Sequence, residues 1–169
     1  MISKKLITEE VALRKLTMLC ARSEHSTGEM IEKMRKWGIA KDAQDRILDY
    51  LITHQYVDDE RYTNFFIDDK ITFNQWGRRK IEQALWNKGI SKNIYQPLLD
   101  EVDDERYLLV LRPLLSDKYP TINAKTEYER SMKLIKFALS RGFSYDQIKK
   151  CINEGIIKDD IEFSDETAD

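Results

Sequence analysis

The pentapeptide Asp58-Asp59-Glu60-Arg61-Tyr62 recurs unchanged at Asp103-Asp104-Glu105-Arg106-Tyr107, 45 residues further along the chain. A glycine followed by a bulky apolar residue occurs three times, at Gly38-Ile39, Gly89-Ile90 and Gly142-Phe143, with spacings of 51 and 53 residues. Self-similarity at this scale is typical of helical arrays, in which each unit buries its apolar face against the next. The repeat therefore predicts an all-α fold and favours a binding surface over a catalytic centre.

The composition agrees with a helical protein. Of the 169 residues, 34% are charged and 41% are hydrophobic, with only six Gly and three Pro, as expected for helices with solvated outer faces. No apolar run approaches the ~20 residues that span a bilayer, and no apolar stretch follows the N-terminal lysines, so we expect neither a membrane segment nor a secretory signal. Cys20 and Cys151 lack metal-ligand spacing and are predicted to be buried, reduced thiols of a cytoplasmic protein.

Apolar spacing predicts nine helices arranged as three triplets. We place the three-helix units at residues 1–55, 56–102 and 103–157 and expect them to form an elongated, curved array. Each glycine of the Gly-apolar pairs is expected to end a helix in a Schellman motif, in which the next residue packs back on the helix. Residues 117–124 should form a loop, and Pro113 should kink the helix before it.

Several predicted helices begin with a side chain that can accept hydrogen bonds from free backbone N–H groups. The predicted N-caps are Thr8, Asp58 and Asp103, and the predicted capping boxes are Ser26-x-x-Glu29 and Ser144-x-x-Gln147. We place Ile31 on the inward face of its helix.

The repeated acids could suggest a metal site or a nuclease. Three consecutive helical side chains point about 100° apart and do not converge on one ion. We therefore expect Asp58 to cap its helix, Asp59 and Glu60 to complement the helix dipole, and Tyr62, Phe65 and Phe66 to face inward. The two histidines, His25 and His54, are expected at the surface, and there is no glycine-rich phosphate loop. No catalytic residue, metal site or cofactor is predicted.

The segment from Trp76 to Lys88 has an unusual outer face. Arg79, Gln83 and Trp86 lie opposite the apolar stripe of Ile81 and Leu85 when counted at 100° per residue. Arg and aromatic side chains are enriched in binding hot spots, and they also suit phosphate and base contacts. The alternative is that Trp86 packs on a neighbouring triplet while the cations are merely solvated.

Basic residues precede the other two marker glycines as well, which suggests a basic ridge along the array. The predicted ridge comprises Arg78, Arg79, Lys80, Gln83, Trp86 and Lys88 in the second unit, Lys33, Arg35 and Lys36 in the first, and Lys133, Lys136 and Arg141 in the third.

Four motifs in this order resemble the RecX family, the regulators of the bacterial recombinase RecA. They are Ala21-Arg22-Ser23-Glu24, then Tyr56-Val57 leading into the first pentapeptide, then Gly77-Arg78-Arg79 leading to Lys88-Gly89-Ile90, and finally Leu139-Ser140-Arg141-Gly142-Phe143. The resemblance extends from about Ala12 to Glu154.

The resemblance implies three tandem three-helix units and a non-enzymatic, monomeric, cytoplasmic protein. It implies that this protein lies in the groove of the RecA–DNA filament and inhibits RecA recombinase, ATPase and coprotease activity. Such a protein modulates homologous recombination, DNA repair and the SOS response, with at most weak direct contact to single- or double-stranded DNA. The rival hypothesis is a helical-repeat scaffold that binds a peptide or another protein partner, and a metal-dependent nuclease ranks last.

The C-terminal segment 158–169 carries six acidic residues and one lysine. It lacks helical periodicity and is predicted to be a disordered acidic tail. The whole chain has a formal net charge of −2, whereas the 27 basic and 24 acidic side chains before the tail give +3. The tail therefore hides a weakly basic body.

Deleting residues 158–169 should strengthen direct binding to DNA at low salt, because it removes five net negative charges. The melting temperature should hardly change. Fluorescence anisotropy with labelled single-stranded DNA, at low and high salt, measures the effect. An unchanged affinity would show that the tail does not screen the basic residues.

Overall fold

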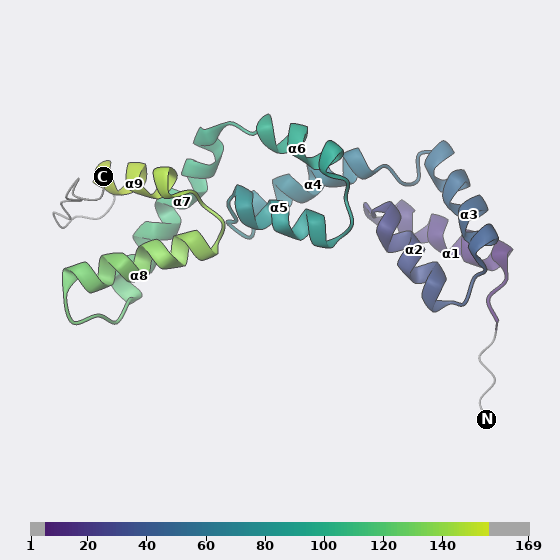
Figure 1. The fold of residues 1–169 in the computed structure, drawn as a ribbon, viewed down its shortest axis with the longest axis horizontal. Helices are drawn as coiled ribbons and strands as arrows, with labels where there is room; N and C mark the ends of the chain where they lie inside the picture. The colour runs from purple at the N-terminus through teal and green to yellow at the C-terminus, as the bar shows by residue number, and fades with distance from the viewer. Residues whose placement is uncertain (1–5, 156–169) are drawn as a thin grey trace, which may run out of the picture. The chain divides into compact units, whose positions relative to one another are not determined.

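The structure is a computed structural model of the protein, and it describes residues 6–155. This part of the chain is all-helical, with nine α-helices, one short 3₁₀ helix and no strand, so the predicted fold class is confirmed (Figure 1). The helices are α1 (Glu9–Arg22), α2 (Thr27–Lys36), α3 (Lys41–Thr53), α4 (Asp59–Thr72), α5 (Arg78–Asn87), α6 (Lys92–Asp100), α7 (Asp104–Lys118), η1 (Tyr119–Thr121), α8 (Glu127–Ser140) and α9 (Tyr145–Asn153). The predicted acidic tail, 158–169, lies outside the described residues.

The chain divides into two compact units. Unit 1 is Met1–Phe66 with Ala84–Leu98, and unit 2 is Ile67–Gln83 with Leu99–Asp169. In unit 1, helices α1, α2 and α3 pack around one apolar cluster (Figure 1). Its fully buried members are Ala12, Leu16, Met30, Met34 and Leu51.

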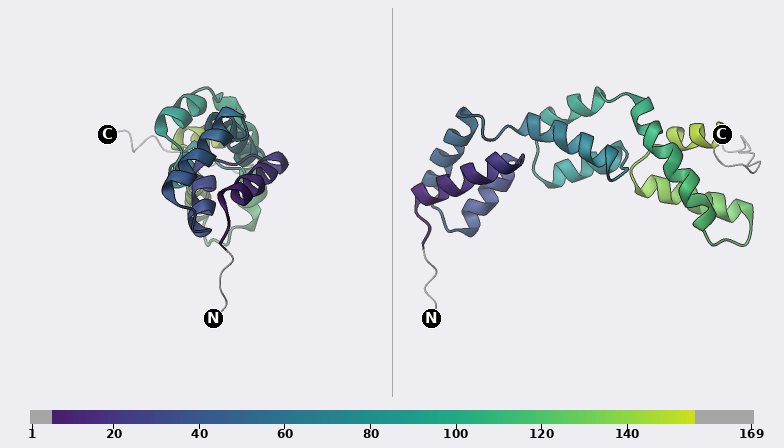
Figure 2. Two further views of the ribbon diagram at one scale, coloured as in Figure 1. Left: turned by 90° about the vertical axis from the view of Figure 1, so that its right-hand side faces the viewer. Right: turned by 180° about the vertical axis from the view of Figure 1, so that it is seen from behind.

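In unit 2, helices α7, α8 and α9 pack on one another, as the right-hand view of Figure 2 shows. Each helix contributes one apolar stripe, and the completely buried side chains are Leu108, Leu111 and Leu115 from α7, Leu134 and Ala138 from α8, and Ile148 and Cys151 from α9. Burial raises the pKa of the Cys151 thiol to about 11, so this thiol is protonated and unreactive at neutral pH.

The three marker glycines end their helices as predicted. Gly38, Gly89 and Gly142 have φ angles of +74°, +80° and +96°, a region that residues with a Cβ rarely adopt. The following residue donates its backbone N–H back to the helix in each case, for example Ile39 to the Met34 carbonyl at 3.0 Å. These are the bonds of the Schellman motif.

Gly142 also takes part in a junction between helices in unit 2, together with Gly77, and the sequence did not reveal this junction. The N–H of Gly77 donates to the Arg141 carbonyl at 2.8 Å, and the N–H of Arg79 donates to the Gly142 carbonyl at 3.1 Å. The backbone carbonyls of the two residues that follow α8 thus accept hydrogen bonds from N–H groups at the start of α5, which would otherwise be unpaired. A Cβ on Gly77 would lie 2.4 Å from backbone atoms of Gly142 and Phe143, so only glycine allows this approach.

The predicted caps are partly confirmed. Thr8 and Asp58 accept backbone N–H groups of their first turns, and Ser144 with Gln147 forms a complete capping box. The prediction for Asp103 is wrong, because its side chain makes no capping hydrogen bond.

One further prediction about side chains at helix starts needs correction, and two aspartates have an additional role. Ser26 caps α2, but Glu29 of the expected capping box turns to His25, with 2.7 Å between Oε2 and Nδ1. Asp59 and Asp104 do more than complement a dipole. The Asp59 carboxylate accepts from the N–H and the hydroxyl of Thr27, and the Asp104 carboxylate accepts from the Gln147 amide.

Two predicted inward residues are exposed. Ile31 is 38% exposed, because it lies about 100° around α2 from the buried Met30. Phe65 is 59% exposed, because the buried stripe of α4 runs through Thr63 and Ile67 and Phe65 falls on the far side.

The loop predicted at 117–124 is wrong in its first half. Helix α7 continues through Pro113 to Lys118, and η1 occupies Tyr119–Thr121. The sequence analysis also missed that Pro97 lies inside α6. Proline weakens a helix but does not forbid it where packing on other elements is strong.

The different roles of Asp58 and Asp103 can be measured by substitution. Asp58→Ala should lower the free energy of unfolding by ~1 kcal/mol through loss of an N-cap, whereas Asp103→Ala should be nearly neutral. Chemical denaturation of both variants, with Asp58→Asn as the conservative control, checks this. Equal losses at both positions would contradict the difference in capping.

Gly77→Ala tests the junction between α5 and α8. The new methyl group meets backbone that cannot move aside, so we expect a loss of ~2–3 kcal/mol in unfolding free energy. Gly89→Ala is the control. Its Cβ would meet open space, leaving only the ~1 kcal/mol cost of the left-handed conformation. A Gly77→Ala variant as stable as Gly89→Ala would show that the junction can relax.

Candidate functional site

Three lysines of the predicted ridge lie around one groove in unit 1. Lys33 and Lys36 come from the last turn of α2, and Lys88 follows the last residue of α5. The groove has a volume of about 560 Å³, and His25, Gly28, Glu29, Glu32 and Asn87 complete its lining. The two segments approach closely here, since a Cβ on Gly28 would lie 3.0 Å from the Lys88 carbonyl oxygen. The groove thus gathers three ammonium groups, and Glu29 and Glu32 in its lining offset part of their charge.

His25 is not the surface histidine that the sequence suggested. Its side chain is 19% exposed and lies between the Ser23 hydroxyl, at 3.1 Å, and the Glu29 carboxylate. Glu29 also accepts a hydrogen bond from the hydroxyl of Tyr62, which together with burial raises the pKa of that tyrosine. His54 is exposed as expected and stacks on Tyr50, with 3.9 Å between ring centroids.

The outer face of α5 presents the residues that the sequence placed there. Arg79 and Gln83 are exposed, and Trp86 is 68% exposed. The alternative in which Trp86 packs on a neighbouring triplet therefore does not hold for the described chain. Trp and Arg are the residue types enriched at binding hot spots, so this pair is a candidate contact surface.

Several ridge residues are already engaged within the protein. Arg78 pairs with Asp100 at 2.6 Å, and Arg35 pairs with Glu32 at 2.7 Å. Lys80 lies over the ring of Trp76, 4.8 Å from its centroid.

The third-unit residues of the ridge lie in unit 2, whereas the lysine groove belongs to unit 1. Lys133 donates to the Asn123 carbonyl at 2.7 Å, and Arg141 donates to the Asn74 carbonyl at 3.0 Å. Lys136 is exposed. The structure therefore leaves fewer cations free for a partner than the sequence pattern suggested.

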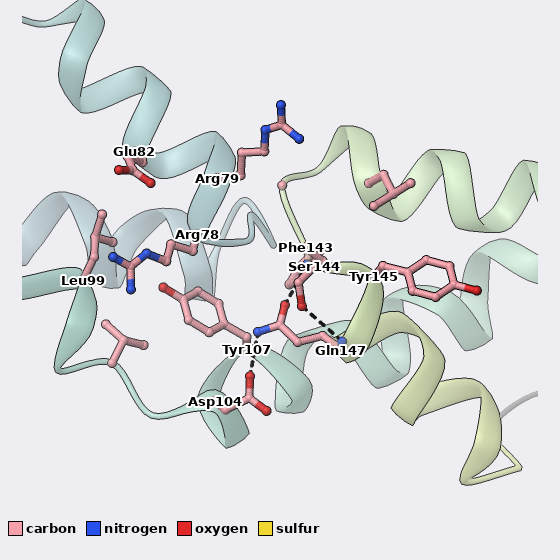
Figure 3. Close-up of a pocket in the computed structure, with 13 residues that line it drawn as sticks. Arg78, Arg79, Glu82, Leu99, Asp104, Tyr107, Phe143, Ser144, Tyr145 and Gln147 are labelled. Carbon is pink, nitrogen blue, oxygen red and sulfur yellow. Dashed lines mark hydrogen bonds between the residues drawn. The ribbon is translucent and has the colours of Figure 1, made fainter. Parts of the chain in front are cut away.

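A second cleft, of about 550 Å³, lies in unit 2 (Figure 3). Arg78, Arg79 and Glu82 from α5 line one side, and the start of α9 lines the other. Gln147 is fixed there by three hydrogen bonds, two with Ser144 and one to the Asp104 carboxylate at 2.8 Å. The sequence identified Gln147 only as a capping residue and gave no sign of this cleft, because its walls come from segments far apart in the chain.

Residues 6–155 hold no cluster of three or more His, Cys, Asp or Glu side chains that could bind a metal ion. No helix in this part of the chain is long and apolar enough to cross a membrane. The features that remain are a basic groove, an exposed Arg–Trp face and a mixed cleft, all of which suit binding.

Comparison with known proteins gives the family. Two family models match, described as the second three-helix domain of RecX, at residues 58–96, and the third, at residues 104–152. A regulatory protein RecX from Chlorobium limicola is 34% identical over 145 residues, which cover 85% of this chain and 87% of that relative. The chain belongs to the RecX family.

Other RecX proteins are longer than the region they share with this chain. A regulatory protein RecX from Clostridium botulinum is 33% identical over 128 residues, and the match covers 74% of this chain but only 59% of that relative.

Two solved RecX structures share the fold. A crystal structure of RecX from Lactobacillus salivarius superposes with a TM-score of 0.75 at 22% identity and covers 86% of this chain and 95% of its own. A second, described as regulatory protein RecX, gives 0.79 at 18% identity and covers 86% and 73%. At these identities the likeness concerns the helical fold alone. The matched RecX domains include all of α5 and the walls of the unit 2 cleft that follow Asp104.

Proposed function

We propose that this RecX-family protein binds the RecA–DNA filament and inhibits RecA, and thereby modulates homologous recombination, DNA repair and the SOS response. The observation that carries the proposal is membership of a family whose relatives are named regulatory proteins. In this proposal the protein acts in the cytoplasm as a monomer and regulates by binding, without catalysing a reaction.

Two surfaces support binding to a filament of protein and nucleic acid. The groove lined by Lys33, Lys36 and Lys88 offers ammonium groups to phosphates, and such contacts gain from the release of counterions. The outer face of α5 offers Arg79 and Trp86, the residue types that most often anchor protein interfaces. Phosphate contacts position a protein without reading sequence, as a regulator of a filament requires.

The charge of the chain favours RecA over naked DNA as the principal partner. With a net charge of −2 and a pI of about 5.8, the protein as a whole is weakly repelled by DNA, and the net charge of +3 on the residues before 158 supplies only modest attraction. Protein contacts must therefore supply most of the affinity. Direct binding to DNA should be weak and should fall steeply with salt.

The double variant Arg79→Ala with Trp86→Ala tests the face of α5. Both side chains are exposed, so helicity should be unchanged, whereas binding to preformed RecA–ssDNA filaments should weaken by at least ~2 kcal/mol. Inhibition of ssDNA-dependent ATP hydrolysis by RecA should weaken in parallel.

The matched control is Arg14→Ala with Met18→Ala, which removes a cation and an exposed apolar side chain from α1. It should inhibit RecA like the parent. If the α5 variant also inhibits like the parent, this face is not the contact, and the residues of α2, Lys33, Arg35 and Lys36, become the next to test. A parent chain that neither binds the filament nor alters ATP hydrolysis would refute the proposed function.

A further inference from the structure

The two copies of the pentapeptide leave their tyrosines in different states. Tyr62 in unit 1 is 8% exposed, and its hydroxyl donates to the Glu29 carboxylate. Tyr107 in unit 2 is only 3% exposed, yet its hydroxyl has no hydrogen-bond partner among the described residues. A buried hydroxyl without a partner costs free energy, so the difference calls for a physical explanation.

The repeat itself explains the missing acceptor. When Gly38 is matched to Gly89, Glu29 of α2 falls on Lys80 of α5. Lys80 cannot accept a hydrogen bond, and its ammonium group lies over the Trp76 ring. The carboxylate that serves Tyr62 therefore has no counterpart beside Tyr107.

The carboxylates of Asp104 and Glu82 both lie near enough for their charges to act on Tyr107, but neither accepts a hydrogen bond from its hydroxyl. The Asp104 carboxylate is bonded to the amide of Gln147 at 2.8 Å. Burial raises the pKa of Tyr107 to about 12 despite the nearby Arg78 and Arg106. The hydroxyl therefore stays protonated at neutral pH, and its O–H group can donate a hydrogen bond that no acceptor among the described residues receives.

The Tyr107 hydroxyl lines the cleft of unit 2 and points toward the side chain of Arg78 (Figure 3). Within residues 6–155, the guanidinium of Arg78 makes one hydrogen bond to a side chain, from Nη2 to Asp100, so donors are left among its five N–H groups. Arg79 is exposed at the rim of the same cleft. Apolar side chains form much of the remaining wall: Leu99, Val102, Leu139 and Phe143.

We propose that this cleft receives the carboxylate of an Asp or Glu side chain from a protein partner. One carboxylate oxygen accepts from the Tyr107 hydroxyl and the other from the guanidinium of Arg78, as Glu29 does for Tyr62 within unit 1. The proposal rests on the proposed function only for the identity of the partner, which would then be a RecA subunit.

The lining of the cleft favours a protein over nucleic acid. The carboxylates of Glu82 and Asp104 also line the cleft and offset the charges of Arg78 and Arg79, so the cleft has no net positive charge to attract a chain of phosphates. A single carboxylate is received instead by directed hydrogen bonds from Tyr107 and Arg78. The apolar wall suits an aliphatic residue next to the acid.

Tyr107→Phe and Tyr62→Phe form a matched pair for the test. Tyr107→Phe removes an unpaired buried hydroxyl, so the melting temperature should be unchanged or higher, whereas Tyr62→Phe leaves Glu29 without one donor and should lower it. A clear fall in the melting temperature of Tyr107→Phe would mean that the hydroxyl is already satisfied within the protein and would overturn the proposal.

Binding is measured by titrating the full ¹⁵N-labelled chain with acetyl-leucyl-glutamyl-leucine amide and following its backbone amide signals. The glutamyl peptide should give saturable shifts at residues 78–82 and 144–147. The control is the same peptide with glutamine in place of glutamate. Its affinity should be at least about tenfold lower, since a hydrogen bond to a charged group is lost. Tyr107→Phe should weaken binding of the glutamyl peptide to the same degree, and Tyr62→Phe should leave it unchanged.

Three results would overturn the proposal. The first is equal binding of both peptides, or binding that Tyr107→Phe does not affect. The second is a stronger response of the same amides to inorganic phosphate, which would assign the cleft to nucleic acid. The third is a large gain in peptide affinity when residues 158–169 are deleted, which would make the acidic tail of the chain itself the occupant. Because RecA is absent from this assay, its failure is distinct from failure of the proposed function.

Discussion

In unit 2, the start of α5 meets the end of α8 through backbone alone. Two N–H groups of the α5 start, those of Gly77 and Arg79, donate to carbonyls of Arg141 and Gly142. This junction satisfies groups that helix ends otherwise leave unpaired, and it brings two helices closer than any side chain would allow. It also sets the position of Arg78 and Arg79 at the cleft. The geometry of the cleft therefore depends on two glycines that carry no chemistry themselves.

The repeated pentapeptide shows how one motif can serve two purposes. In both copies the tyrosine is buried, and the side chain of the second aspartate accepts a hydrogen bond from a residue of another helix. Asp59 accepts from Thr27, and Asp104 accepts from Gln147. The structural role is conserved between the repeats. The first aspartate caps its helix only in the first copy, and the acceptor of the tyrosine hydroxyl also differs, because a glutamate in α2 is replaced by a lysine in α5. A structural contact in one repeat becomes an open binding position in the next.

The basic residues before each marker glycine are not equivalent. Lys33, Lys36 and Lys88 surround one groove, whereas Arg78 and Arg141 are held by Asp100 and the Asn74 carbonyl. A cation that is already paired within the protein loses less hydration and less conformational freedom when a partner binds, but it also has fewer N–H donors left for that partner. The exposed Trp86 and Arg79 therefore carry more weight as partner contacts than a count of charges suggests.

The sequence by itself determined the number of helices and most of their ends, although not the end of α7. The period of apolar residues, the capping side chains Thr8, Asp58 and Ser144, and the Gly-apolar pairs are local signals, and local hydrogen bonds decide them. It also determined that Arg79 and Trp86 face solvent, since helical periodicity fixes which side of α5 they occupy. Only the tertiary structure decided which lysines share a groove, that the Asp59 and Asp104 carboxylates bind other helices, and that the Tyr107 hydroxyl lacks an acceptor among the described residues. Those outcomes depend on contacts between residues far apart in the chain, and no local pattern encodes which partner a side chain will meet.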